Sequence, residues 1–404
     1  MHDQSSRLAF VSASESSPAS EAHFRPSALA AATATFVLTG ATASLYGPLL
    51  LGFAHHFHLT VPAAGTVISV NFAGALPGVL CGWLGVKRAS GGLVLAVSSI
   101  VLAAGAIGAA LSPRWTLFLL SVFVIGLGFG GLDFSLNTLL ARTSLVGRVH
   151  RLSVANAGYG VGAVIGPLLV VALHPRHFPT LFVGIGALAV ALATLYRGVH
   201  APPLRAEVHQ RRVSSMRAQR RPILVTFVVA YVLYVALETS SSGWMATQLH
   251  GEGHTESLAG LVTAGFWAGL AVGRVLGAPL FRRSSDKILV LGGLGGVIVL
   301  SVSALSTAVA PFTYPVMGLV MASVFPMGLI WYTVLCPHDG DGLALMILFM
   351  MAGGVIGPGL ESLMVSAFSV HVIPVVIAAF ALADLFVFAS ALRFRPLVAT
   401  ERTP

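Results

Sequence analysis

The sequence predicts an all-α membrane protein in which twelve transmembrane helices form two six-helix bundles related by a pseudo-twofold axis. The chain of 404 residues is 56% hydrophobic and only 9% charged, whereas a soluble domain carries roughly a quarter charged residues. Its apolar residues fall into runs that are each close to the ~20 residues needed to cross a hydrocarbon core. The pattern of the first six runs returns in the last six, which predicts the two bundles.

The apolar runs are separated by short breaks that contain polar residues, glycine and proline. In chain order the runs cover 27–52, 60–86, 90–111, 115–140, 152–173, 178–197, 222–248, 257–281, 287–309, 312–335, 342–367 and 371–393. They predict an N-terminal bundle over 27–197 and a C-terminal bundle over 222–393.

Three polar segments flank and join these bundles. Residues 1–26 are rich in serine and alanine and lack a compact apolar core before a cleavage site, so we expect a disordered cytoplasmic tail and no signal peptide. The longest polar break, 198–221, is strongly basic and is expected to be a cytoplasmic linker. Residues 394–404 are expected to form a second cytoplasmic tail.

The basic residues gather in alternate breaks. Those breaks contain Lys87 and Arg88, then Arg142, Arg148 and Arg151, then Arg197 to Arg221, then Arg282, Arg283 and Lys287, and finally Arg393 and Arg395. The intervening breaks contain only Arg114 and Arg176. This asymmetry predicts a multi-pass protein of the inner (plasma) membrane with both termini in the cytoplasm. The break at 336–341 is acidic and is the exception.

Two stretches of the first half return in the second half in the same orientation. Phe72-Ala73-Gly74 corresponds to Trp267-Ala268-Gly269, and the stretch Gly162–Pro167 resembles Gly353–Pro358. Such a parallel repeat indicates halves related by an axis along the membrane normal. Glycines also recur every fourth residue in the second and eighth runs, which predicts close packing of helix backbones.

The turn after the second run resembles a loop signature of the major facilitator superfamily, Gly-x-x-x-Asp-Arg-x-Gly-Arg-Arg. Here Gly82 is followed by Lys87 and Arg88, and the acidic residue of the signature is missing. The resemblance extends over essentially the whole chain and implies the major facilitator fold. It also implies gate or ion-pair roles for the basic residues of this turn and of its counterpart, namely Lys87, Arg88, Arg282 and Arg283.

Two longer stretches resemble the branch of that superfamily that contains fucose–proton symporters and sugar permeases. They are Gly128–Asn137 in the fourth run and Glu238–Trp244 in the seventh, the latter followed by Gly265–Arg274. The stretch Gly162–Pro167 is also similar to the fifth-helix motif of drug–proton antiporters, although Leu169 and Val170 replace the trailing glycines of that motif. The resemblance therefore implies sugar uptake and leaves export as an alternative.

Two carboxyl groups lie within apolar runs. A charged side chain in lipid costs at least a few kcal/mol, so Asp133 and Glu238 are expected to face a protein interior or a water path. Asn137 shares a helical face with Asp133. In the resembled superfamily the first, fourth, seventh and tenth helices line the central path, which places both acids there. We predict proton-coupling or substrate-binding roles for Asp133, Asn137 and Glu238; a static hydrogen bond between helices is the alternative.

Further side chains are expected around this path. Hydroxyl groups beside a carboxylate suit a polyhydroxylated solute, and the Trp267 indole can stack on a sugar ring or simply pack. The predicted substrate cavity contains Tyr46, Asn71, Tyr231, Ser241, Ser242 and Trp267.

Arg274 is the only basic residue deep in a run and requires a partner or water. Asp133, Asp384 and Asp286 are the candidate partners, and we expect an ion pair near the cytoplasmic gate.

The sequence contains no phosphate-binding Gly-x-x-x-x-Gly-Lys-Ser/Thr loop and no nucleophile elbow, so we expect no enzyme, no cofactor and no metal site. We predict a monomeric secondary transporter in a lipid bilayer that takes a small sugar-like solute with a proton and binds no nucleic acid. A proton-driven exporter of amphipathic drugs or metabolites and a non-transporting receptor or scaffold are the alternatives.

Overall fold

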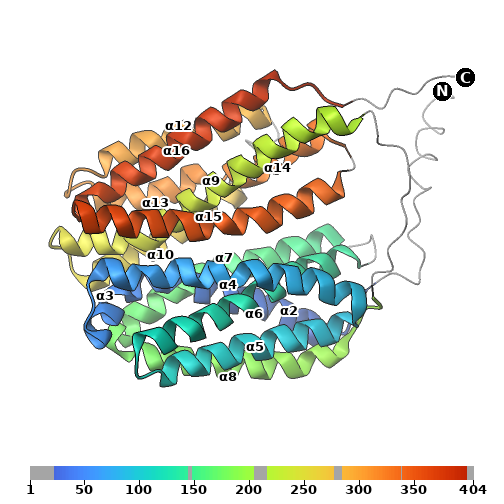
Figure 1. Ribbon diagram of the computed structural model, residues 1–404, viewed down its shortest axis with the longest axis horizontal. Coiled ribbons are helices and arrows are strands. Elements are labelled where there is room, and N and C mark those ends of the chain that lie inside the picture. The colour runs from blue at the N-terminus through green and yellow to red at the C-terminus, as the bar shows by residue number, and fades with distance from the viewer. Residues whose placement is uncertain (1–21, 144–147, 204–215, 277–283, 338, 398–404) are drawn as a thin grey trace, which may run out of the picture.

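The computed structural model describes residues 22–143, 148–203, 216–276, 284–337 and 339–397. Twelve helical segments in this part are long and apolar enough to cross a membrane, which confirms the predicted fold class. Figure 1 shows the helices in two groups that lie side by side, one formed by α2–α8 and the other by α9–α16.

The N-terminal bundle contains α2 (Pro26–Ser44), α3 (Tyr46–Phe57), α4 (Val61–Arg88), α5 (Gly91–Leu111), α6 (Trp115–Ala141), α7 (Arg148–Leu173) and α8 (Phe178–Leu195). The C-terminal bundle contains α9 (Met216–Gly251), α10 (Glu256–Leu276), α12 (Asp286–Ser303), α13 (Ala310–Met321), α14 (Val324–Leu335), α15 (Gly340–Ala367) and α16 (Ile373–Ser390).

Two predicted runs are each divided into two helices. The first run breaks at Leu45, between α2 and α3. The Ser44 hydroxyl donates to the Ala41 carbonyl at 3.2 Å, and Pro48 has no backbone N–H to donate to the preceding turn. The tenth run breaks between α13 and α14, where Pro326 has the same effect.

The first and last described residues are bonded to the same end of the bundles, which we call the terminal end. The Ala22 amide donates to the Arg142 carbonyl at 3.1 Å, and the Leu397 amide donates to the Leu335 carbonyl at 2.9 Å. The other end, which carries the turns after α3 and α9, is called the opposite end.

The segments outside the helices are more ordered than predicted. Strand β1 (His23–Phe24) pairs antiparallel with β2 (Val199–His200), so residues 22–26 are not the disordered tail that the sequence predicts. Helix α9 starts at Met216, inside the predicted linker. Residues 1–21, 204–215 and 398–404 lie outside the described residues.

An ion pair explains the acidic break at the terminal end. The Arg220 guanidinium donates to both carboxylate oxygens of Asp339 at 2.5 Å, and the Tyr332 hydroxyl donates to the same carboxylate at 2.5 Å. The carboxylate also accepts from the Gly342 amide at 2.8 Å and so caps α15. Asp339 is neutralised locally and therefore does not oppose the basic character of this end.

Glycines let the helix backbones touch, as predicted from their spacing. A Cβ atom at Gly74 would overlap the Phe123 carbonyl of α6, and one at Gly126 would overlap the Asn71 carbonyl of α4. In the second half, a Cβ atom at Gly269 of α10 would overlap the Pro315 carbonyl of α13. The pairs α4–α6 and α10–α13 thus pack in the same way, which confirms the repeat.

Substitution of Gly126 tests this packing. We expect Gly126→Ala to lower the thermal unfolding midpoint of the purified protein by several degrees, because overpacking costs about 1–3 kcal/mol. Gly184→Ala is the matched control, since a Cβ atom there would meet nothing within 4 Å. Equal midpoints for the two variants would contradict the packing account.

Candidate functional site

Three charged side chains from both bundles line one cavity. The cavity lies between the bundles and has a volume of about 200 Å³. Asp133 reaches it from α6, Glu238 from α9 and Arg274 from α10. The structure therefore brings together the two carboxyl groups and the arginine that the sequence indicated.

Glu238 and Arg274 form a cluster with Tyr234. The Tyr234 hydroxyl donates to the Glu238 carboxylate at 3.3 Å, and the Arg274 guanidinium lies within electrostatic range of both residues. Arg274 is thus placed beside Glu238 and not at the partners predicted for it, because α9 and α10 are consecutive helices of one bundle whose cavity faces adjoin.

The candidate partners of Arg274 have different surroundings. Asp133 lines the same cavity, from the other bundle. Asp384 is fully buried on α16 and interacts with Tyr231, and Asp286 starts α12 and accepts from Ser285 at 3.3 Å.

Asp133 is held by amide groups. The Asn137 amide donates to the Asp133 carboxylate at 3.3 Å and to its backbone carbonyl at 2.9 Å. Asn156 of α7 donates in turn to the Asn137 side-chain oxygen at 3.3 Å. Among the described residues no lysine, arginine or histidine forms an ion pair with Asp133. Asn137 therefore positions Asp133 and does not itself line the cavity.

Half of the predicted cavity residues line the cavity. Tyr46, Ser242 and Trp267 do so. The Trp267 indole N–H has no hydrogen-bond acceptor within the described part of the chain, although it is buried. The indole ring lines the cavity, but its N–H is buried and is not exposed to the cavity.

The other three predicted cavity residues face elsewhere. Asn71 donates to the Tyr46 hydroxyl at 3.1 Å and supports that wall residue from behind. Tyr231 donates to the Phe325 carbonyl at 2.6 Å, and Ser241 donates to the Leu237 carbonyl at 2.8 Å. Ser241 follows Glu238 by nearly one helical turn and so lies close to its face, but it is fully buried and does not line the cavity.

Lys87 and Arg88, the described residues of the two predicted basic turns, form no charge lock with other described residues. The Lys87 ammonium lies over the Trp83 ring of its own helix, 3.5 Å from the ring centre, and Arg88 is exposed. No ion pair of either residue is found within the described ranges. Arg282 and Arg283 lie outside the described residues.

Two tyrosines near the charged residues of the site were not predicted from the sequence. Tyr159 of α7 lines the cavity and lies within electrostatic range of Asp133, Glu238 and Arg274. Tyr234 precedes Glu238 by one helical turn, and this spacing could have revealed it. Tyr159 lies in a glycine-rich helix without a charged neighbour, and no sequence signal marks it.

Two more carboxyl groups are buried away from the cavity. Glu361 on α15 and Asp384 on α16 are both fully buried. Their carboxyl oxygens complete no hydrogen bond with any described residue, although the Ser240 hydroxyl lies close to Glu361. A buried carboxylate without partners is costly, so we expect both groups to be neutral in this conformation.

The bundles seal the cavity toward the opposite end. The Trp244 ring of α9 occupies the place where a Cβ atom of Gly65 would stand. The Ser69 hydroxyl donates to the Val355 carbonyl at 2.8 Å, and the Ser362 hydroxyl donates to the Pro62 carbonyl at 2.7 Å. Each of these contacts joins the two bundles.

Toward the terminal end the bundles are less closely joined. Helix α3 packs against α9 at the opposite end, whereas the described residues of α6 and α14 make no comparable contact. Asn156 and Arg274 lie on the terminal side of the cavity and are exposed. The structure is therefore closed at the opposite end and open toward the terminal end.

The chain matches a family model and several solved structures. The model described as Major Facilitator Superfamily matches residues 32–339. No curated protein sequence matches the chain.

Three similar structures cover nearly the whole chain. A nucleoside transporter has a TM-score of 0.74 at 14% identity, over 91% of this chain and 100% of its own. A D-xylose–proton symporter has a TM-score of 0.73 at 16% identity, over 92% of this chain and 98% of its own. The fucose–proton symporter of E. coli has a TM-score of 0.63 at 18% identity, over 90% and 97%. At these identities the likeness shows the fold.

Labelling of a cysteine in the cavity tests the direction of its opening. In a chain with Cys81→Ser and Cys336→Ser, we expect Met350→Cys to react with a membrane-impermeant maleimide only from the terminal side, because the seal blocks the other route. His55→Cys, exposed at the opposite end, is the control and should react only from there. Reaction of both variants from the same side of sealed vesicles would refute this assignment.

Proposed function

The chain belongs to the Major Facilitator Superfamily of membrane transporters, and on that basis we propose that it moves a small polar, sugar-like solute together with a proton. It is a multi-pass membrane transporter and not an enzyme. The observation that carries the proposal is the single cavity lined by Asp133, Glu238 and Arg274. The two bundles rock about this cavity and expose it to each side in turn.

Asp133 is the proton carrier in this proposal. It accepts a hydrogen bond from the Asn137 amide and has no ion-pair partner among the described residues, and a charged carboxyl group within a membrane is costly. Glu238 differs because the Tyr234 hydroxyl donates to it and the Arg274 guanidinium lies near it. Because the two carboxyl groups have different surroundings, they have different roles: Asp133 exchanges the proton and Glu238 binds the polar solute.

The cavity supports a small solute with hydroxyl groups. Its volume of about 200 Å³ lies below the 300–1,000 Å³ that is usual for drug-sized ligands. The Arg274 guanidinium and the Glu238 carboxylate offer a donor and an acceptor, and the Trp267 ring offers a flat apolar surface. Two of the similar structures are of sugar–proton symporters, which agrees with this choice.

Export of an amphipathic compound is the second candidate. Phenylalanine and methionine form much of the cavity wall, including Phe72, Phe129, Phe325, Met350 and Met351. Such side chains adapt to varied apolar ligands. Counterflow in proteoliposomes separates the candidates, because an exporter of this kind would exchange dyes or drugs but not sugars.

The basic residues favour an orientation with the terminal end in the cytoplasm. Arg25, Lys87, Arg88, Arg142, Arg197, Arg220, Lys287, Arg393 and Arg395 lie at or near that end, and Arg114 and Arg176 lie at the opposite end. We infer an inner (plasma) membrane protein with both termini inside. Because one chain supplies both bundles and the whole cavity, a monomer suffices for transport.

Substitution of each carboxyl group by its neutral isostere tests the separate roles of Asp133 and Glu238. We expect Asp133→Asn to reduce solute accumulation driven by a pH gradient at least tenfold while solute counterflow continues, since only the proton step is lost. Glu238→Gln should weaken counterflow as well. Both are measured in proteoliposomes, with Asp286→Asn as the control.

The decisive outcome concerns Asp133→Asn. If this variant accumulates solute on a pH gradient as well as the unaltered chain does, Asp133 is not the proton carrier.

A further inference from the structure

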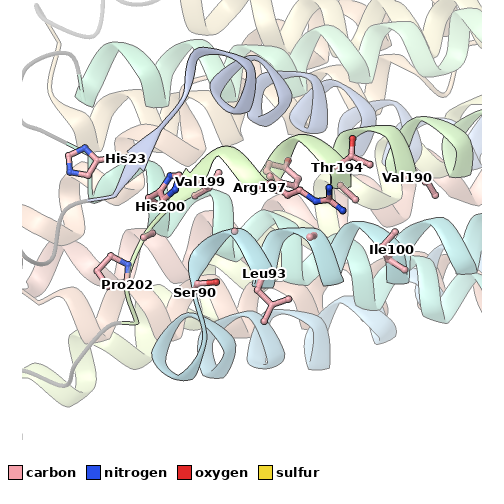
Figure 2. Close-up of a pocket in the computed structure, with 15 residues that line it drawn as sticks. His23, Ser90, Leu93, Ile100, Val190, Thr194, Arg197, Val199, His200 and Pro202 are labelled. Carbon is pink, nitrogen blue, oxygen red and sulfur yellow. The ribbon is translucent and has the colours of Figure 1, made fainter.

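A large groove lies on the N-terminal bundle, away from the central cavity. It has a volume of about 900 Å³ and runs between α5 and α8 beside strand β2 (Figure 2). It belongs to neither the seal nor the cavity between the bundles. The transport proposal assigns it no role.

The groove has a polar end at the terminal end of the bundle. Figure 2 shows His23, His200 and Ser90 together at one end of the groove, with Arg197 farther along. His23 and His200 are partners in the β1–β2 pairing, so the small sheet holds two imidazoles here. None of the residues that line the groove is acidic.

The rest of the groove is apolar and faces outward. Leu93, Ile100 and Val190 line it and are 56%, 47% and 45% exposed. They lie on membrane-spanning helices, so lipid tails cover this surface in a bilayer. Leu93 and Ile100 are seven residues apart on α5, which places them ~10 Å apart along the helix axis.

The groove is built by close contacts beneath it. A Cβ atom at Gly92 would lie 2.6 Å from the Tyr196 carbonyl oxygen, so the start of α5 touches the turn after α8. The Tyr196 hydroxyl forms a 2.5 Å hydrogen bond with Thr35 of α2. Three helices thus fix the backbone that carries Arg197.

We propose that this groove binds one anionic phospholipid. The headgroup lies at the polar end of the groove, with its phosphate between Arg197 on one side and Ser90, His23 and His200 on the other, and an acyl chain follows Leu93, Ile100 and Val190. Positive charge without acidic neighbours complements an anionic headgroup, and each basic residue near the surface contributes to such attraction. The cytoplasmic leaflet, in which the proposed orientation places this end, is the anionic one.

The bound lipid would join parts of the chain that are distant in sequence. It would contact α5, α8 and both strands, and strand β2 leads directly into the segment between the bundles. We therefore expect the lipid to stabilise the terminal end of the N-terminal bundle against unfolding.

Lipid binding to the purified full-length chain tests the proposal. Native mass spectrometry and thermal unfolding in a neutral detergent would compare phosphatidylglycerol, phosphatidylcholine and inorganic phosphate. We expect a retained phosphatidylglycerol and a higher unfolding midpoint with it, and neither effect with the other two. An equal effect of phosphatidylcholine, or a full effect of phosphate alone, would overturn the proposal.

Two variants locate the site. Arg197→Gln should weaken phosphatidylglycerol binding about fivefold, the effect of one basic residue near a membrane surface, whereas Arg176→Gln at the opposite end should leave it unchanged. Ser90→Asp adds a negative charge at the headgroup position and keeps a residue suited to a helix N-cap, so it should weaken binding without unfolding α5. Unchanged binding in both Arg197→Gln and Ser90→Asp would place the lipid elsewhere.

Discussion

The proposed function of this protein depends on an imbalance of charge among the side chains that line its central cavity. Asp133, Glu238 and Arg274 are the charged residues that line the central cavity, and two carboxylates with one guanidinium leave one negative charge uncompensated. In a low-dielectric interior such a charge is expensive. A proton on one carboxyl group removes the cost. Since Arg274 and Tyr234 lie beside Glu238, the proposed function assigns this proton to Asp133.

Residues that follow the two helix breaks line this cavity. Tyr46 and Gly47 follow the break between α2 and α3 directly and line the cavity wall, and Phe325 follows the break between α13 and α14 and does the same. Irregular backbone in a membrane protein is tolerated where it lines a cavity or is buried in protein. The glycine contacts pack the helices of each bundle closely, so the proposed function places the movement at the interface between the bundles.

The sequence was enough to predict what depends on local patterns. The twelve spans follow from hydropathy, the two bundles from the repeat, and the common face of Asp133 and Asn137 from helical spacing. Contacts between segments that are distant in the sequence could not be predicted from the sequence. Arg220 and Asp339 are 119 residues apart, and the burial of Asn71, Tyr231 and Ser241 depends on how each helix is rotated against its neighbours. Tyr159 reaches the charges only after the bundles pack together, so no spacing could reveal it.

Infrared difference spectroscopy of the carboxyl groups tests the central claim most directly. The carbonyl band of a protonated carboxyl group is separate from the bands of a carboxylate, and isosteric variants assign it to a residue. In the state that is closed at the opposite end, the account predicts a carbonyl band from a protonated carboxyl group. Asp133→Asn removes this band and Glu238→Gln leaves it in place. Glu361 and Asp384 contribute a background that neither substitution changes. A spectrum that Asp133→Asn leaves unchanged would show that Asp133 is ionised in the cavity, and the proposed balance of charge would be wrong.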